Sequence, residues 1–272
     1  MKKIAVFLCL VLLLYSFPVS VFAAEPGTLP NKSDSKLYDE LFPSSDNTVK
    51  ILFIGNSYTY YNNFCATFTN LCNIAGKSVS VRQVTKGSHS LSQVANPKDL
   101  EGARVRNLLS TQKWDYVVLQ DRHRYPIKKP QRIANAIETL QPYITASGAK
   151  MILFMSWAPL KGHRDYKKLS HIVPTKAAYE RKLKETFTNL AAKYNAIVAP
   201  VGTAFSKCQK KYPNIRLIRK DKSHPTATGS YLSACVMYQT IFGTPAKGLT
   251  YKANLPAARA KKLQRIAATV MN

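Results

Sequence analysis

Acidic residues are scarce in this sequence. Only 14 of its 272 residues are aspartate or glutamate, against 40 lysines and arginines, so the formal net charge is +26. A protein this basic is attracted to anionic surfaces such as wall polymers, acidic polysaccharides and lipid headgroups, although the charge also serves plain solubility. The basic residues are scattered, and no helix-turn-helix, zinc-finger or aromatic RNA-binding signature accompanies them. We therefore expect no nucleic-acid partner.

Long apolar runs are also scarce. The sequence contains a single one, at residues 4–14. It follows a basic start at residues 1–3 and precedes small or apolar residues at 21–23, as in a secretory signal peptide. A membrane anchor is the alternative, because the charge-free stretch is long enough. Pro18 favours cleavage, so we predict a signal peptide over residues 1–23. The mature protein is then secreted, periplasmic or part of the cell envelope, with no integral membrane segment.

Metal-binding cysteine patterns are missing too. No cysteine and histidine residues have the spacing of a zinc site. Cys65 and Cys72 are seven residues apart in a predicted helix, a rise of about 10 Å, which is too far for a disulfide. Cys208 with Cys235 is the one pairing that we consider.

From residue 49 onward, short apolar runs alternate with helical patterns. The predicted strands cover residues 49–54, 79–84, 114–119, 151–155 and 196–199. The predicted helices cover 62–75, 98–110, 130–147, 174–194, 201–211, 226–242 and a basic C-terminal segment at 255–271. This alternation predicts βαβ units and a parallel sheet, in which ligands bind at the carboxyl ends of the strands.

No repeat or linker divides this region, so we predict one domain over residues 49–272. Residues 24–48 are rich in Pro, Ser, Asp and Asn, which predicts a poorly ordered lead-in.

The first strand is followed by Gly55, Asn56 and Ser57. Gly55 permits a sharp turn because it has no Cβ to clash. The turn lifts Ser57 to the rim of the sheet, where the dipole of the next helix favours negative charge. Taken alone, a serine at this place is most often only a helix N-cap.

A second segment strengthens the case for chemistry. Asp221 stands three residues before His224, in a loop that precedes a helix starting near Pro225. An aspartate at this spacing can accept the Nδ1 proton of the histidine. The Nε2 atom is then free to take a proton from a serine.

Together the two segments resemble the SGNH (GDSL-like) hydrolases, which have a Gly-[Asp/Asn]-Ser block after the first strand and an Asp-x-x-His block near the C-terminus. The resemblance covers roughly residues 49–243. It is greatest for a bacterial branch with Asn in the first block and Gln after the third strand, as in residues 115–120 here. It implies a three-layer α/β/α flavodoxin-like fold with a five-stranded parallel sheet. It also implies hydrolysis of acyl esters through an acyl-enzyme, with Ser57 as nucleophile, His224 as base and acid, and Asp221 orienting His224.

The resemblance is incomplete at the oxyanion hole. It implies two backbone N–H donors, from Ser57 and Gly87, and an Asn side chain from a third block. Here that block reads Gln-Asp-Arg-His at 120–123, without Asn. Losing one donor costs about 3 kcal/mol of transition-state stabilisation. We assign the third donor to Gln120 and keep Arg122 as its competitor.

Other residues are candidates for binding the substrate. Arg122 is one of them. Trp157 follows the fourth strand and could stack on a sugar ring, with core packing as the alternative. His123 is a candidate for the mouth of the site. His163 and Arg164 could contact an anionic substrate.

The function we predict is a secreted serine esterase that removes O-acetyl or similar acyl groups, from a small molecule or a polysaccharide, without a metal or organic cofactor. The α/β-hydrolase elbow is excluded because Thr59 replaces its second glycine, and neither a P-loop nor a dinucleotide-binding motif is present. One alternative is a non-catalytic protein of the same fold that binds an anionic cell-surface polymer. Another is a membrane-surface protein that uses the basic C-terminal helix.

Overall fold

The computed structural model describes residues 48–271. The predicted signal peptide, and all but the last residue of the predicted lead-in at 24–48, lie outside the described residues. Within 48–271, no helix combines the length and the apolar character that crossing a bilayer requires.

Five parallel strands form one sheet in the order β2-β1-β3-β4-β5. Their bounds are Val49–Gly55 for β1, Val79–Thr85 for β2, Tyr116–Leu119 for β3, Lys150–Phe154 for β4 and Ile197–Ala199 for β5. This order is that of flavodoxin-like sheets, and it reverses direction between β1 and β3. The predicted fold class is therefore confirmed.

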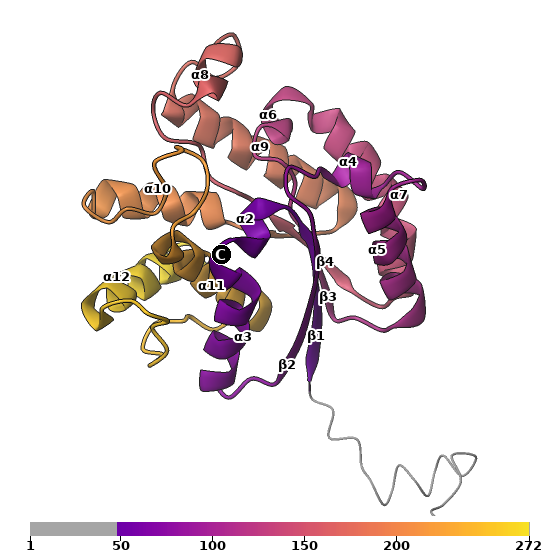
Figure 1. Ribbon diagram of the computed structural model, residues 1–272, viewed down its shortest axis with the longest axis horizontal. Helices are drawn as coiled ribbons and strands as arrows, with labels where there is room; N and C mark the ends of the chain where they lie inside the picture. Colours follow the sequence, from indigo (N-terminus) through magenta and orange to yellow (C-terminus); the bar gives the residue numbers. More distant parts are fainter. Residues whose placement is uncertain (1–47, 272) are drawn as a thin grey trace, which may run out of the picture. The chain divides into compact units, whose positions relative to one another are not determined.

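Helices cover both faces of the sheet (Figure 1). The first face is covered by α3 (Phe64–Ile74), α10 (Val201–Lys211), α11 (Ala227–Phe242) and α12 (Ala257–Ala268). The second is covered by α4 (Leu91–Val94), α5 (Leu100–Thr111), α7 (Pro130–Ala146) and α9 (Lys176–Tyr194). Short helices follow β1, β3 and β4: α2 (Ser57–Tyr60) with the 3₁₀ turn η1 (Tyr61–Asn63), α6 (Tyr125–Lys128) and α8 (Arg164–Lys168).

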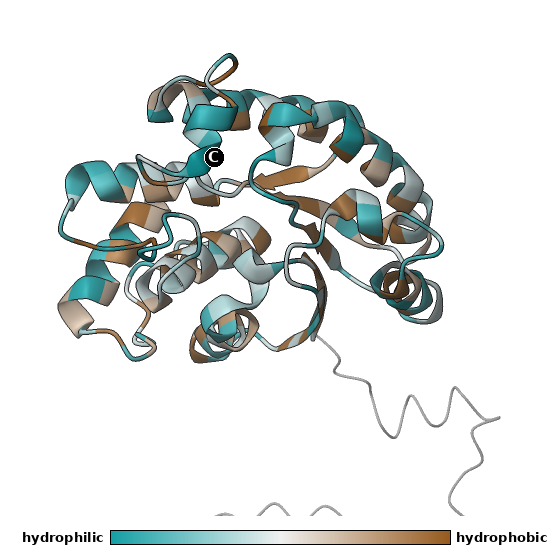
Figure 2. Ribbon diagram, turned by 45° about the horizontal axis from the view of Figure 1, so that its top comes forward, coloured by the Kyte–Doolittle hydropathy of each residue, from teal (hydrophilic) through white to brown (hydrophobic). Residues whose placement is uncertain are grey.

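The three central strands β1, β3 and β4 are buried on both sides, because alternate side chains point to opposite faces and helices cover both faces. Ile51 and Phe53 of β1 belong to the core under α3 and α11. Leu52 and Ile54 belong to the core under α5 and α7. Figure 2 shows the strands as a hydrophobic layer between helices whose outer faces are hydrophilic. This two-sided burial explains why the central strands are nearly continuous apolar runs in the sequence, whereas the edge strand β2 alternates.

The cysteine prediction needs a correction. Cys65, Cys72, Cys208 and Cys235 are all free thiols, so the considered pairing of Cys208 with Cys235 is wrong. Both of these residues are buried in the core beneath α10 and α11, where they pack as small apolar side chains.

Candidate active site

The turn after β1 places Ser57 at the first position of α2. Asn56 caps this helix, since its Oδ1 accepts from the N–H of Tyr58 at 3.2 Å. Its Nδ2 donates to the carbonyl of His89 at 2.9 Å, which ties the loop after β2 to the turn. A Cβ on Gly55 would lie 2.6 Å from Gln120 Oε1 and 2.6 Å from Thr59 Oγ1. The packing at this point thus has room only for glycine.

Ser57, His224 and Asp221 form one hydrogen-bonded chain. Ser57 Oγ lies 2.9 Å from His224 Nε2, and His224 Nδ1 lies 2.9 Å from Asp221 Oδ2. The carboxylate only accepts, so Nδ1 carries the hydrogen and the Nε2 lone pair faces the serine hydroxyl. This is the geometry in which imidazole can take a proton from a nucleophilic serine.

A tight turn holds Asp221 in place. The N–H groups of Ser223 and His224 donate to Asp221 Oδ1 at 2.9 and 3.0 Å. Burial acts to raise the pKa of Asp221, but these backbone hydrogen bonds and the one from the His224 ring outweigh it and lower the pKa. The carboxylate is therefore ionised at neutral pH and stabilises an imidazolium beside it.

Aromatic rings hold His224 in position. Tyr61 stacks on its imidazole at 4.5 Å between ring centres, and Tyr58 meets it edge-on at 5.7 Å. The Tyr58 hydroxyl hydrogen-bonds to Ser223 Oγ at 2.5 Å. Neither tyrosine was predicted from the sequence, although both follow Ser57 within four residues. The only signal is the cluster of tyrosines at 58, 60 and 61.

The structure corrects the binding role predicted for Trp157. This side chain is 1% exposed and lies between the rings of Tyr58 and Phe205, at 4.6 and 4.1 Å. Its Nε1 donates to the Ser223 carbonyl at 3.0 Å. A sugar cannot reach the ring, so Trp157 is a core residue that supports Tyr58 and the loop before His224.

The oxyanion role predicted for Gln120 also needs a correction. Its Oε1 accepts from the N–H of Asn56 at 2.9 Å and from Thr59 Oγ1 at 3.0 Å, and its Nε2 donates to the carbonyl of Asp121. The side chain is 1% exposed and does not line the cavity at Ser57. Gln120 thus fixes the nucleophile turn from beneath.

The two backbone donors predicted for the oxyanion hole stay a prediction. Among residues 48–271, no hydrogen-bond partner is recorded for the N–H of Ser57 or of Gly87. Gly87 lies in an exposed turn, and its neighbour Ser88, with φ of 59°, lines the cavity. Arg122 lines the same cavity, and its guanidinium lies 5.3 Å from the ring centre of Tyr125.

The cavity at Ser57 has a volume of about 420 Å³. Its walls come from the loops after β1, β2, β3 and β4 and from the loop before α11. The lining side chains include, besides Ser57, Asp221 and His224, the basic residues Arg122, Arg164 and Lys222 and the imidazoles of His123 and His163. The site therefore lies where the strand order reverses, as expected for this kind of sheet.

Several solved structures are similar to this chain in fold. A protein from Slackia heliotrinireducens described as an SGNH hydrolase shares 27% identity, with 71% of this chain and 99% of that chain covered and a TM-score of 0.63. A DUF4886 family protein from Bacteroides uniformis has the same fold at 16% identity, with 82% and 94% covered and a TM-score of 0.69. The psychrotrophic esterase EstA from Pseudoalteromonas also has this fold, at 14% identity, with 71% of this chain and 97% of that chain covered and a TM-score of 0.50. No family model and no curated protein matches the sequence.

The fold and the hydrogen-bonded chain of Ser57, His224 and Asp221 are those of a serine hydrolase. In its fold and in the order of these residues along the sequence, the chain is similar to the SGNH (GDSL-like) hydrolases.

Proposed function

We propose that Ser57 is the catalytic nucleophile of this hydrolase, with His224 as general base and then general acid and Asp221 as the residue that orients His224. The hydrogen-bonded chain from Ser57 Oγ through the imidazole to the carboxylate carries this proposal. Ser57 Oγ attacks the ester carbonyl while His224 Nε2 takes its proton. The imidazolium then returns this proton to the departing alcohol, which leaves an acyl group on Ser57.

Water completes the reaction by the same path in reverse order. His224 takes a proton from the water as it attacks the acyl-enzyme, and gives it to Ser57 Oγ as the acid leaves. The N–H groups of Ser57 and Gly87 are the donors for the oxyanion in both steps. Arg122 takes the place of the family's Asn as a charged third donor, because it lines the cavity and Gln120 does not.

The substrate we propose is an O-acetyl or similar short acyl ester on a carbohydrate outside the cytoplasm. The predicted signal peptide supports the location, and the net charge of +26 supports an association with the anionic polymers of a cell surface. The carbohydrate itself is inferred from these two features together.

Ser57→Ala tests the catalytic proposal. We expect the rate of 4-nitrophenyl acetate hydrolysis to fall by about 10³-fold or more, as in other enzymes that lose their nucleophile. The unfolding midpoint should stay within a few degrees of that of the unmodified protein. Ser170→Ala, at an exposed serine outside the cavity, is the control and should keep full activity.

A non-catalytic polymer-binding protein is the second candidate function, and the absence of Asn from the third block favours it. A fluorophosphonate probe separates the two. An activated Ser57 reacts with the probe, and the label is lost in Ser57→Ala and His224→Gln. An unmodified protein that hydrolyses no ester and takes no label would refute the catalytic proposal.

A further inference from the structure

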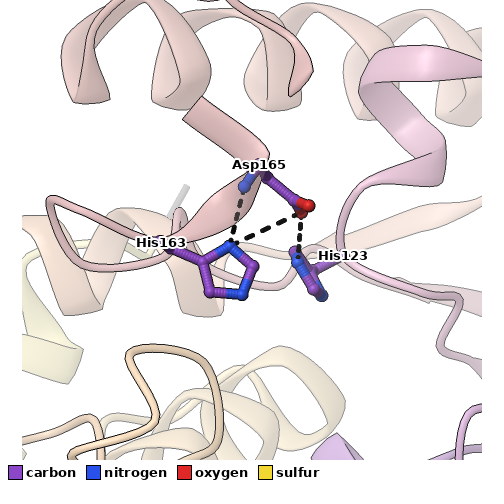
Figure 3. A group of neighbouring side chains, drawn as sticks. All are labelled: His123, His163 and Asp165. Carbon is purple, nitrogen blue, oxygen red and sulfur yellow. Dashed lines mark hydrogen bonds and ion pairs between the residues drawn. The ribbon is translucent and has the colours of Figure 1, made fainter. Parts of the chain in front are cut away.

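Two histidines on the cavity wall share one buried carboxylate. Asp165, at the start of α8, is 1% exposed, and its Oδ2 lies 2.7 Å from His123 Nε2 and 3.8 Å from His163 Nδ1. The N–H of Asp165 also donates to His163 Nδ1 at 3.2 Å. Figure 3 shows both imidazoles on the same side of the carboxylate, each with its second nitrogen directed away from it. Asp165 thus fixes two rings that line the cavity at Ser57.

These contacts decide which atoms the rings present to the cavity. His163 Nδ1 accepts a hydrogen bond, so the neutral ring carries its hydrogen on Nε2 and offers an N–H donor. Burial, ahead of all other causes, lowers the pKa of His163, which keeps the ring neutral at neutral pH. Among residues 48–271, no partner is recorded for His163 Nε2.

Two cations, Arg164 and Lys222, line the cavity together with His163. Arg164 is exposed, and no acidic partner is recorded for it in the described part of the chain. Lys222 reaches the same loop, because its Nζ donates to the Gly162 carbonyl at 3.2 Å. Lys222 has no acidic partner among the described residues either, and its Nζ can donate two more hydrogen bonds. Asp221, the acidic residue of this wall, is already occupied by His224 and backbone N–H groups.

His123, His163 and Asp165 could also hold a divalent cation, since their ligand atoms lie within 4.8 Å of one another. Two observations favour an anion instead. The inner nitrogen of each histidine is already hydrogen-bonded to Asp165, so a metal would have to break both contacts. The neighbouring Arg164 and Lys222 repel a cation and attract an anion.

We propose that His163, Arg164 and Lys222 form an anion-binding subsite beside Ser57, which holds a carboxylate or phosphate group of the substrate. The subsite rests on the proposed function in one respect, namely that the reacting ester lies at Ser57. It makes the substrate an acylated acidic carbohydrate and excludes a neutral one. An N–H donor flanked by two cations matches the several acceptor oxygens of such a group.

Binding to the full-length Ser57→Ala variant tests the subsite without catalysis. The ligands are glucuronate, glucose 6-phosphate and glucose, which differ at one carbon as carboxylate, phosphate ester and hydroxyl. At low salt we expect both anions, or one of them, to bind with a Kd at least tenfold lower than that of glucose. The anion that binds more tightly identifies the charged group of the substrate.

The double change Arg164→Gln with Lys222→Gln should raise the Kd of the preferred anion at least tenfold and leave that of glucose alone. Lys210→Gln with Lys211→Gln on α10 removes the same charge from the wall of a different cavity, and should change neither. Equal binding of glucose and the anions would overturn the proposal. So would Zn²⁺ binding at micromolar Kd that is lost in His163→Ala. If the unmodified protein hydrolyses no ester but still binds the anion, the assignment of Ser57 as nucleophile is refuted and the anion-binding subsite is not.

Discussion

Asn56 works as a donor and an acceptor at once. Its Nδ2 donates to the His89 carbonyl and its Oδ1 accepts from the N–H of Tyr58. An aspartate at this position could only accept, and its second oxygen would face the carbonyl of His89. The choice of Asn in the first block therefore follows from the carbonyl that the loop after β2 presents to it.

Asn56→Asp should destabilise the protein at pH 7 by about 1–3 kcal/mol. This is the usual cost of leaving a buried acceptor, here the His89 carbonyl, without a hydrogen-bond donor. Urea unfolding measures this difference. The loss should shrink as the pH falls and the new carboxyl group gains a proton that it can donate. Equal stability of the two proteins at pH 7 would show that the contact with His89 contributes nothing.

Asp121 is a buried carboxyl group with one oxygen unsatisfied. Its Oδ1 accepts from the N–H groups of Leu91 and Arg122, while no partner is recorded for Oδ2 among residues 48–271. Burial raises the pKa of Asp121 to about 6, against the lowering effect of these hydrogen bonds. At this group the folded protein therefore binds a proton more tightly than the unfolded chain does, and the stability that Asp121 contributes is lost as the pH rises from about 4 to about 6.

Asp121→Asn removes this charge and keeps the accepting oxygen. We expect the variant to gain stability relative to the unmodified protein by up to about 3 kcal/mol between pH 4 and pH 8, the equivalent of a shift of about two pKa units. Urea unfolding at pH 4, 6 and 8 measures the gain. A stability difference that does not change with pH would mean that Asp121 titrates normally.

At the level of helices and strands, glycines set how closely α11 approaches the loop of His224. A Cβ on Gly229 would lie 2.3 Å from the carbonyl oxygen of Leu217, and this backbone cannot move aside easily. The same carbonyl accepts from the N–H of Thr226 at 2.9 Å, just before α11 begins. The start of α11 and the turn with Asp221 and His224 are thus built as one unit.

Gly229→Ala should push α11 away from this turn. We expect a loss of about 1–3 kcal/mol of unfolding free energy, as for other overpacked sites, together with a lower kcat because His224 shifts. Gly87→Ala is the comparison, since its Cβ would meet only the end of the Tyr60 side chain at 3.1 Å. Equal unfolding midpoints for the two variants would contradict this account.

The sequence pattern was sufficient for the long elements and for the two segments that meet at Ser57. Strands buried on both faces are apolar runs, and the long helices α7 and α9 lie within two residues of their predicted bounds. The short helices α2, α4, α6 and α8 were missed because four or five residues are too few to show a helical period.

The roles of Gln120 and Trp157 could not be read from the sequence for a different reason. Each follows a strand at the catalytic edge, where side chains can point into the cavity or beneath it. The direction is set by contacts far away in the chain, between Gln120 and Asn56 and between Trp157 and Ser223. Asp165 was overlooked as well, because nothing in its local sequence shows that His123 lies against it.

On the scale of the whole molecule, positive charge is the dominant feature. Four of the 40 basic residues and five of the 14 acidic ones lie within residues 1–47, which leaves 36 against 9 and a net charge of +27 for the rest of the chain. Repulsion among these charges opposes the compact state. Ion pairs offset little of it, because those recorded between lysine or arginine and glutamate in residues 48–271 are partly or largely exposed.

Salt should therefore stabilise this protein. Raising NaCl from about 20 mM to about 300 mM shortens the screening length from about 20 Å to about 6 Å, and weakens repulsion more than it weakens the few surface pairs. We expect an increase in unfolding free energy on the order of 1 kcal/mol, measured by urea unfolding at fixed pH, which levels off once screening is complete. Lys210→Gln with Lys211→Gln should show a smaller increase because it starts with less charge. A steady fall in stability with added salt would mean that the exposed ion pairs outweigh the repulsion.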